Sequence, residues 1–424
     1  MRDWATCHWV SLCAVASAFA VAFVIGNSSN GAAENLPNSA VPTECDRLAA
    51  DPQDPDLPKG FPSVRKPKDI NADAALPACR RALEEAPGDR RVRFQLGRAL
   101  ESAKEFEEAE IEYERAASAG DVSAMANLGD LYVDGVAVRK NYGQVRAWLQ
   151  NAAEQGSAWG QDGLGLFYAN GWGVEQDYDQ ARAWLEKAAN QGLAEGQFNL
   201  GVLYLQGAGV AQDYARAQAL FQTAADQGHV EALVNLAAIY VNGWGVAKDY
   251  VRVRALYQQA ADQGDPIAES SLGQLYAEGL GGPQDYAEAR AWYLKGAEQG
   301  DAPGQFNLAL LYEHGQGGPQ DYTEARAWYQ RAADRGIAEA QYTLGVLYEI
   351  GQGGPQDYAQ ARAWEQRAAD QGDAKAQYNL GVLYEIGQGG PQDYARARAW
   401  YEKAADQGDA DAIAKLLLAA GQSR

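Results

Sequence analysis

The sequence predicts an all-α protein, a right-handed α-solenoid of repeated helix-turn-helix units. Three observations predict this fold: a 36-residue period, apolar residues at helical spacing within each period, and glycine-rich breaks between the helical segments. The period is clearest in one set of tyrosines, Tyr142, Tyr178, Tyr214, Tyr250, Tyr286, Tyr322, Tyr358 and Tyr394. One such hairpin has too little apolar surface to fold alone, so we expect neighbouring units to stack.

Composition excludes several function classes. The 424 residues contain 36 Lys and Arg against 57 Asp and Glu, for a net charge of −21. So large an acid excess argues against nucleic-acid binding, because little would neutralise the phosphates. Three histidines (His8, His229, His314) leave little material for a metal site or a catalytic base. We therefore expect no catalytic residue, no metal and no cofactor, and predict that the protein is not an enzyme.

The first 33 residues resemble a secretory signal peptide. An uncharged apolar run spans residues 9–26, Arg2 precedes it, and small residues precede a cleavage point after Ala33. The alternative is an uncleaved membrane anchor, because the run is long enough to span a bilayer. The prediction is an exported, periplasmic protein; the alternative is an inner-membrane anchor that carries a periplasmic solenoid.

Two cysteines, Cys45 and Cys79, remain once Cys7 and Cys13 leave with the signal peptide. Two cysteines in an exported protein suggest one disulfide. The alternative is two unrelated thiols. The segment 34–70 is rich in Pro and Asp, and we expect it to be extended rather than helical.

Residues 71–120 show small and bulky residues at helical spacing. The series runs Ala75, Cys79, Ala82, Leu96, Gly97, Leu100, Ala109, Tyr113 and Ala116. This pattern resembles the tetratricopeptide repeat, in which two antiparallel helices pack closely. One helix of this region lacks a hairpin partner. We predict that the disulfide holds the segment 34–70 over that helix as an N-terminal cap.

Eight repeats fill residues 121–408, and a capping helix or tail follows at 409–424. In the unit 337–372, Ala340, Leu344 and Leu347 form the apolar stripe of a first helix. Gly345 within that helix costs about 1 kcal/mol relative to Ala, so we expect a close approach of the neighbouring helix there. Asp357 is the expected N-cap of the second helix.

The recurring pattern L-G-x-x-Y-x-x-G-x-G-x-x-x-D-Y-x-x-A-x-x-W-x-x-x-A-A-x-x-G resembles the Sel1-like repeat, a relative of the tetratricopeptide repeat, in its exported bacterial form. Among the departures, Leu220 and Leu256 replace the Trp, and Glu365 stands where a bulky residue is usual. The resemblance implies an adaptor that binds other proteins in signalling or envelope processes.

No motif indicates chemistry. The GQGGPQD loops lack the Lys-Ser/Thr of a phosphate-binding loop and recur in similar form in the other repeats, which indicates helix-breaking turns. His229 and His314 are expected to be solvent-facing residues at helix ends. The acid excess is spread along the chain, which fits a solvated surface. The alternative is an acidic face for a basic segment of a partner.

Two tryptophans are candidates for partner binding. Trp172 and Trp244 occupy the same loop position in the second and fourth repeats, where other repeats have smaller or polar residues. Exposed tryptophans are favoured at binding hot spots. The alternative is that each ring covers the edge of the hairpin beneath it.

The sequence therefore predicts a non-enzymatic scaffold of the cell envelope that presents a concave surface to other proteins. Membrane contact is expected only through an uncleaved N-terminal segment. The alternative function is binding or hydrolysis of cell-wall material, such as peptidoglycan or β-lactam-like ligands, because some relatives are associated with penicillin binding.

Overall fold

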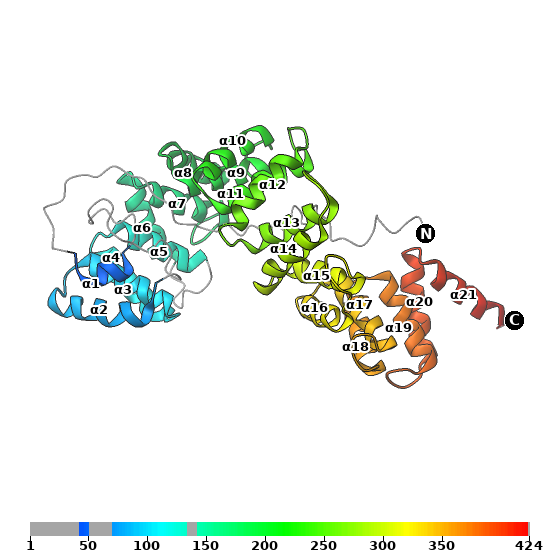
Figure 1. Ribbon diagram of the computed structural model, residues 1–424. Helices are drawn as coiled ribbons and strands as arrows, with labels where there is room; N and C mark the ends of the chain where they lie inside the picture. The colour runs from blue at the N-terminus through cyan, green and yellow to red at the C-terminus, as the bar shows by residue number, and fades with distance from the viewer. Residues whose placement is uncertain (1–41, 51–69, 134–141, 423–424) are drawn as a thin grey trace. The chain divides into compact units, whose positions relative to one another are not determined.

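The computed structural model describes residues 42–50, 70–133 and 142–422, and within these ranges every regular element is a helix (Figure 1). The expected signal peptide lies outside the described residues, as do the prolines and aspartates of 51–69. Within the described ranges, none of the helices is both long and apolar enough to span a bilayer. The chain divides into two compact units that meet between Ala247 and Lys248.

The N-terminal unit contains eleven helices within the part of the chain that is described. They are α1 (Glu44–Ala49), α2 (Ala72–Glu85), α3 (Arg90–Ser102), α4 (Phe106–Ser118), α5 (Val122–Val133), α6 (Tyr142–Glu154), α7 (Ala158–Asn170), α8 (Tyr178–Asn190), α9 (Ala194–Gln206), α10 (Tyr214–Asp226) and α11 (Val230–Asn242). From α2 onward, helices that are consecutive in the chain pack against each other, which is the arrangement of an α-solenoid.

The C-terminal unit continues the same alternation through its described residues. Its helices are α12 (Tyr250–Ala261), α13 (Pro266–Glu278), α14 (Tyr286–Glu298), α15 (Ala302–His314), α16 (Tyr322–Asp334), α17 (Ala338–Ile350), α18 (Tyr358–Asp370), α19 (Ala374–Ile386), α20 (Tyr394–Asp406) and α21 (Ala410–Gln422). The odd-numbered helix of each hairpin is called its first helix below, and the even-numbered one its second helix. The last helix, α21, lies where we expect the capping helix.

A glycine inside the first helix lets the second helix come close. A Cβ atom on Gly345 would lie 2.9 Å from Cγ of Glu365, and one on Gly381 would lie 2.6 Å from Cε1 of Tyr401. Atoms at these distances overlap, so the neighbouring side chain would have to move. The prediction that Gly345 serves a close helix approach is confirmed.

The turn between the two helices is closed by the chain itself. The carbonyl of Leu347 accepts hydrogen bonds from the N–H groups of Gly351 and Gln352, and Gly351 has left-handed backbone geometry (φ 72°). Oδ1 of Asp357 then accepts from the N–H groups of Ala359 and Gln360 at 2.9 and 3.0 Å. Asp357 is thus the N-cap of α18, as expected.

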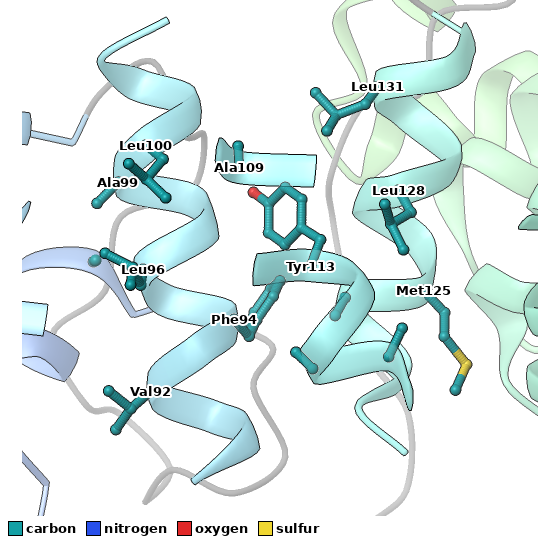
Figure 2. Packing of buried hydrophobic residues seen from close by; sticks show 14 of the residues in the cluster. Val92, Phe94, Leu96, Ala99, Leu100, Ala109, Tyr113, Met125, Leu128 and Leu131 are labelled. Atoms are coloured by element: carbon teal, nitrogen blue, oxygen red, sulfur yellow. The ribbon is translucent and has the colours of Figure 1, made fainter. Parts of the chain in front are cut away.

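The tetratricopeptide-like region packs around Tyr113 of α4. Its ring is fully buried, and Figure 2 shows it between the apolar residues of α3, such as Leu96, and Leu128 of α5. A Cβ atom on Gly97 would lie 2.5 Å from Cδ1 of Tyr113, so this hairpin uses the same glycine device as the later repeats. The core of the N-terminal unit therefore runs without a break from these helices into the repeats.

The segment 34–70 is not wholly extended, which corrects the expectation from sequence. Residues 44–49 form α1, which begins with a capping box. Oδ2 of Asp46 accepts from the backbone N–H of Thr43 at 2.6 Å, while Oγ1 of Thr43 accepts from the N–H of Asp46 at 3.2 Å. These reciprocal bonds allow a six-residue helix to form where proline-rich sequence follows.

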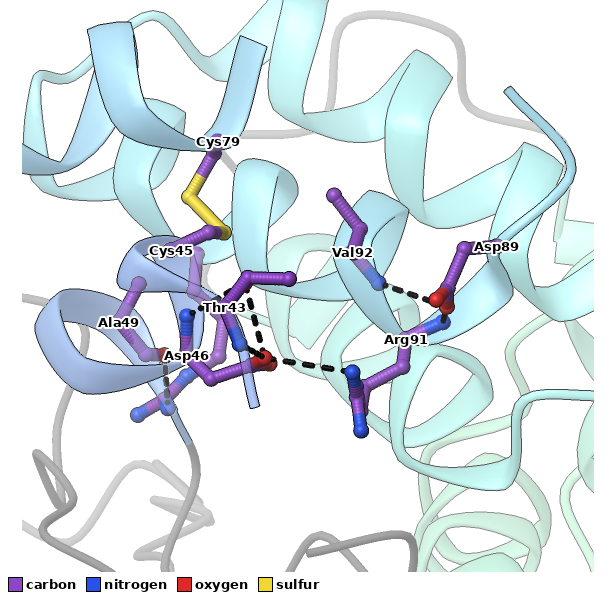
Figure 3. The surroundings of a disulfide bond; sticks show 9 residues. Thr43, Cys45, Asp46, Ala49, Cys79, Asp89, Arg91 and Val92 are labelled. Carbon is purple, nitrogen blue, oxygen red and sulfur yellow. Dashed lines mark hydrogen bonds and ion pairs between the residues drawn. A yellow bond between two sulfur atoms is a disulfide. The ribbon is translucent and has the colours of Figure 1, made fainter. Parts of the chain in front are cut away.

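A disulfide joins α1 to α2. Cys45 and Cys79 are bonded and both are fully buried, which confirms the predicted pairing (Figure 3). Next to it, a buried ion pair joins Asp46 to Arg91 of α3 at 3.2 Å, and Nη1 of Arg98 donates to the carbonyl of Ala49 at 2.8 Å. Helix α1 therefore covers α2 and α3, and it supplies the cap that the sequence predicted for the uncovered helix.

Candidate functional site

Within the described residues, polar groups of the glycine-rich loops form hydrogen bonds with the two helices that flank each loop, and the loops do not form a phosphate-binding site. Nε2 of Gln356 donates to the carbonyl of Glu349 at 2.6 Å and to the hydroxyl of Tyr358 at 2.9 Å. The N–H of Asp357 donates to the carbonyl of Tyr348 at 2.9 Å. The Gln-Asp-Tyr sequence that recurs in these loops thus ties both helices to the turn, which supports the interpretation as helix-breaking turns.

The second loop glycine touches the preceding repeat. Gly353 has φ 72°, and a Cβ atom there would lie 2.1 Å from the carbonyl oxygen of Tyr322 at the start of α16. A side chain at this place would therefore meet both backbone strain and a steric clash. The loop is an inter-repeat contact as well as a turn.

An arginine on the second helix clamps the next repeat in the C-terminal unit. The guanidinium of Arg326 lies 3.7 Å from the ring centroid of Tyr348, and its Nη1 donates to the carbonyls of Gln352 and Pro355 at 3.4 and 3.2 Å. Gly354 leaves the space for it, since a Cβ atom there would lie 2.7 Å from Nη1. The same stacking recurs as Arg254–Tyr276, Arg290–Tyr312 and Arg362–Tyr384, at 3.6, 3.7 and 3.6 Å. The sequence analysis did not predict this clamp. Its sequence signal is a Gly-Gly pair in the loop that receives the arginine, and among the eight repeats only these four loops contain it.

The two candidate tryptophans both lie against the preceding repeat. Trp172 stacks on Tyr142 with ring centroids 6.5 Å apart and meets Phe167 edge-on at 5.6 Å. Trp244 stacks on Tyr214 at 5.6 Å. Both rings are half-buried. Each ring therefore packs between successive repeats, and a role in partner binding stays a prediction.

A hydrogen bond from a tyrosine to a carboxylate recurs where the second helix meets the first. The pairs are Tyr113–Glu101 at 2.7 Å, Tyr329–Glu313 at 2.5 Å and Tyr401–Glu385 at 2.6 Å. Burial, and then the nearby carboxylate, raises the pKa of each tyrosine hydroxyl, so that it stays a protonated donor.

Asp162 and Glu365 are buried carboxyl groups, and neither forms an ion pair with a cation among the residues that the structure describes. Asp162 of α7 is fully buried and accepts from Nδ2 of Asn199 with both oxygens, at 3.1 and 3.2 Å. Burial raises its pKa to about 7, and the bond from Asn199 opposes the shift. Glu365 of α18 is also fully buried, and burial raises its pKa well above the usual value. Sequence reasoning noted Glu365 as a departure from the repeat and did not foresee its burial.

Comparison with known proteins identifies the repeats. The model of the Sel1 repeat matches residues 122–157, 160–193, 194–229, 230–265, 266–301, 302–337, 338–373 and 374–409. The chain belongs to the Sel1 repeat family. A tetratricopeptide repeat model matches residues 71–130. Both predicted resemblances are thereby confirmed, and the matched repeats begin one residue later than predicted, at residue 122.

Two solved structures support the assignment. The chain is 39% identical to a protective antigen present in uropathogenic Escherichia coli strains, over 72% of this chain and 66% of that one, with a TM-score of 0.63. It thus spans slightly less than two thirds of that relative. It is 32% identical to a Sel1 repeat protein from Oxalobacter formigenes, over 73% and 89% of the two chains, with a TM-score of 0.56. A search of curated proteins finds no match.

Sel1 repeat proteins are generally non-catalytic scaffolds for protein–protein interaction. In the part of the chain that the structure describes, no three His, Cys, Asp or Glu side chains gather as metal ligands would. His314 is exposed at the end of α15, as expected. His229 corrects the expectation, because it is only 5% exposed. It is the N-cap of α11, where its Nδ1 accepts from the N–H of Ala232, and it stacks on Phe198.

Exposed apolar side chains mark the C-terminal Sel1 repeats. Ile350 and Ile386 end two successive first helices, α17 and α19, and are 57% and 51% exposed. Leu417 and Leu418 of α21 are also exposed. Exposed apolar side chains at the same place in neighbouring repeats are typical of a surface that binds a partner protein.

Proposed function

We propose that this Sel1 repeat protein is a non-enzymatic scaffold of the cell envelope, which binds partner proteins along the face formed by its first helices. The observation that carries the proposal is the exposed pair Ile350 and Ile386, one repeat apart on a rigidly tied framework. Because an arginine of the preceding repeat holds the loops that follow Ile350 and Ile386, the spacing between these two side chains is set before a partner arrives. Preorganisation of this kind lowers the entropy cost of binding.

The proposed location is the periplasm. The buried disulfide between Cys45 and Cys79 supports an oxidising compartment, where such bonds persist. The similar protein from uropathogenic strains is a protective antigen, and antibodies reach exported proteins more readily than internal ones. N-terminal sequencing of the mature protein tests the proposal. A chain that starts at Glu34 is expected, whereas a reduced, unprocessed protein in the cytoplasm would contradict it.

The binding role is tested by crosslinking in living cells followed by mass spectrometry. Wild type is compared with a Trp172→Ala/Trp244→Ala variant and with Trp184→Ala, a control that changes a half-buried tryptophan on the second helix α8. A defined set of partner proteins is expected with wild type and with the control. If the double variant alone loses them, the loops at Trp172 and Trp244 belong to the binding edge. Recovery of wall fragments without a partner protein would favour the cell-wall ligand alternative.

A further inference from the structure

Glu365 occupies a place that holds tyrosine in the neighbouring repeats. The equivalent residues, Tyr329 of α16 and Tyr401 of α20, use their hydroxyls to donate to a glutamate of the first helix. An ionised Glu365 cannot donate such a hydrogen bond, because a carboxylate only accepts. Its Oε1 accepts from Nδ2 of Asn379 at 3.2 Å, and its buried Oε2 has no hydrogen-bond partner within the described ranges.

Among the described residues, the groups that act on Glu365 supply no positive charge. Glu349 of α17 stands where Glu313 and Glu385 stand in the repeats on either side, so a carboxylate faces a carboxylate here. Tyr342 of α17 and Asp373, the N-cap of α19, also act on Glu365, and Asn379 of α19 completes the surroundings. A buried carboxylate without a cation is costly, since its lost hydration is not replaced.

One repeat further along, the fold holds an ammonium group at this same place. Lys415 of α21 stands in the position of Asn379, and its Nζ lies 2.6 Å from Oε2 of Glu385. The same Oε2 also accepts the hydroxyl of Tyr401. The bond from Lys415 lowers the pKa of Glu385. Glu385 of the first helix and Tyr401 of the second helix thus lie around the ammonium group of Lys415. We call this binding place for an ammonium group the seat, and in the last repeat the chain's own Lys415 occupies it.

We propose that Glu349 and Glu365 form a receptor for a lysine side chain of the partner protein, between α17 and α19. This inference rests on the proposed scaffold function. Glu349 is half-buried and therefore partly open to solvent, whereas Glu365 is fully buried. Asn379 and Glu365 have shorter side chains than Lys415 and Tyr401, which occupy the equivalent positions one repeat later. An ammonium group bound between Glu349 and Glu365 would supply the positive charge that Lys415 supplies to Glu385.

The seat is tested first without a partner, by supplying the ammonium group from within the chain. Asn379→Lys reproduces the arrangement of Lys415, and Asn379→Met is the matched control, with a similar length and no charge. At pH 7.5 the Lys variant is expected to melt several degrees above the Met variant. That difference should vanish when Glu349 and Glu365 are both changed to Gln. Equal melting temperatures of the two variants would overturn the proposal.

The second test uses a tripeptide, acetyl-Gly-Lys-Gly-amide, as the probe. It is expected to raise the melting temperature of wild type in a concentration-dependent manner and to bind Glu365→Gln at least tenfold more weakly. The peptide with an acetylated lysine side chain should have no effect. An equal response to both peptides, or to wild type and Glu365→Gln, would overturn the lysine receptor.

The partner itself separates this inference from the proposed function. Asn379→Lys should reduce crosslinking to partner proteins at least tenfold, because its own ammonium group fills the seat. If partners are still captured undiminished, the receptor is overturned and the scaffold stands. If wild type captures no partner protein at all, the proposed function itself fails.

Discussion

The guanidinium of Arg362 in α18 lies 3.6 Å from the ring centroid of Tyr384 in α19, and its Nη1 lies 3.4 Å from the carbonyl oxygen of Pro391. One side chain of a second helix thus holds both the first helix and the loop of the next repeat. Gly390 makes this possible, because a Cβ atom there would lie 2.4 Å from Nη1. The position of each C-terminal loop is therefore set by the repeat before it.

Arg326→Ala should lower the stability of the C-terminal repeats by about 2 kcal/mol. The change removes a stacked guanidinium that is only 9% exposed and leaves the carbonyls of Gln352 and Pro355 without their donor. Shifts in the denaturation midpoint measure the effect. Arg398→Ala is the control, since that exposed side chain pairs with Glu402 in the same helix, and its effect should stay within about 0.5 kcal/mol. Equal effects of the two changes would contradict the clamp.

Gly353→Ala should cost about 3 kcal/mol or more, because the new methyl group meets both left-handed backbone geometry and the Tyr322 carbonyl. Gly372→Ala is matched to it: Gly372 also has positive φ, at 95°, and a Cβ atom there has no neighbour within 4 Å. The free energy of unfolding of Gly372→Ala should fall only by the cost of the backbone strain, about 1–2 kcal/mol. Urea denaturation of both variants makes the comparison, and a larger loss at Gly372 would refute the inter-repeat contact.

The stability of the N-terminal repeats should fall as the pH rises toward 8. Asp162 has a pKa of about 7 in the folded protein, above its ordinary value of 3.8, so the folded state binds this proton more tightly than the unfolded state. The stabilisation is complete below about pH 4 and is lost as the pH rises to 7. A protonated Asp162 also carries the donor that the buried Oδ1 of Asn199 lacks.

Asp162→Asn cannot ionise, so this loss should disappear. Between pH 5 and pH 8 the wild type should lose about 2–3 kcal/mol more than the variant. Thermal melts across the pH range measure the difference. Asp179→Asn changes an exposed aspartate of α8 and should leave the pH slope of the wild type in place. If the stability of Asp162→Asn fell with pH as steeply as that of the wild type, Asp162 would not be the group responsible for the pH dependence.

Loss of the disulfide should act locally. The bond closes a loop with a sequence separation of 34, which the chain-entropy account values at about 3–4 kcal/mol. In a Cys45→Ala/Cys79→Ala variant, α1 should separate from α2 and α3. The effect should stay local, because each repeat contacts only its neighbours. Hydrogen exchange should speed up in α1 to α3 and stay unchanged from α13 onward. Faster exchange through α20 would show instead that the cap supports the whole chain.

The repeat architecture could be predicted because its signals are local and recur. Gly345, Asp357 and the loop glycines each report a helix contact, a cap or a turn through residue type alone. The disulfide could be predicted because, of the four cysteines, only Cys45 and Cys79 lie outside the predicted signal peptide of residues 1–33.

Features that depend on tertiary packing escaped the sequence. Helix α1 had a visible signal, the capping-box spacing of Thr43 and Asp46, but the surrounding prolines masked it. His229 is buried because Phe198 of another helix stacks on it, which no local pattern reports. Glu365 stood out as an exception in its repeat, yet only the fold shows that Glu349 faces it and that Lys415 fills the equivalent seat one repeat later.

The central claim is that partner proteins bind along the face of the first helices. Photo-crosslinking amino acids placed in turn at Ile350 and Ile386 test it most directly, with Ala363 and Ala399 on second helices as exposed controls. The same partner protein should be captured from living cells at both first-helix positions and at neither control position. Capture only at Ala363 and Ala399, or no protein captured at any of the four positions, would contradict it.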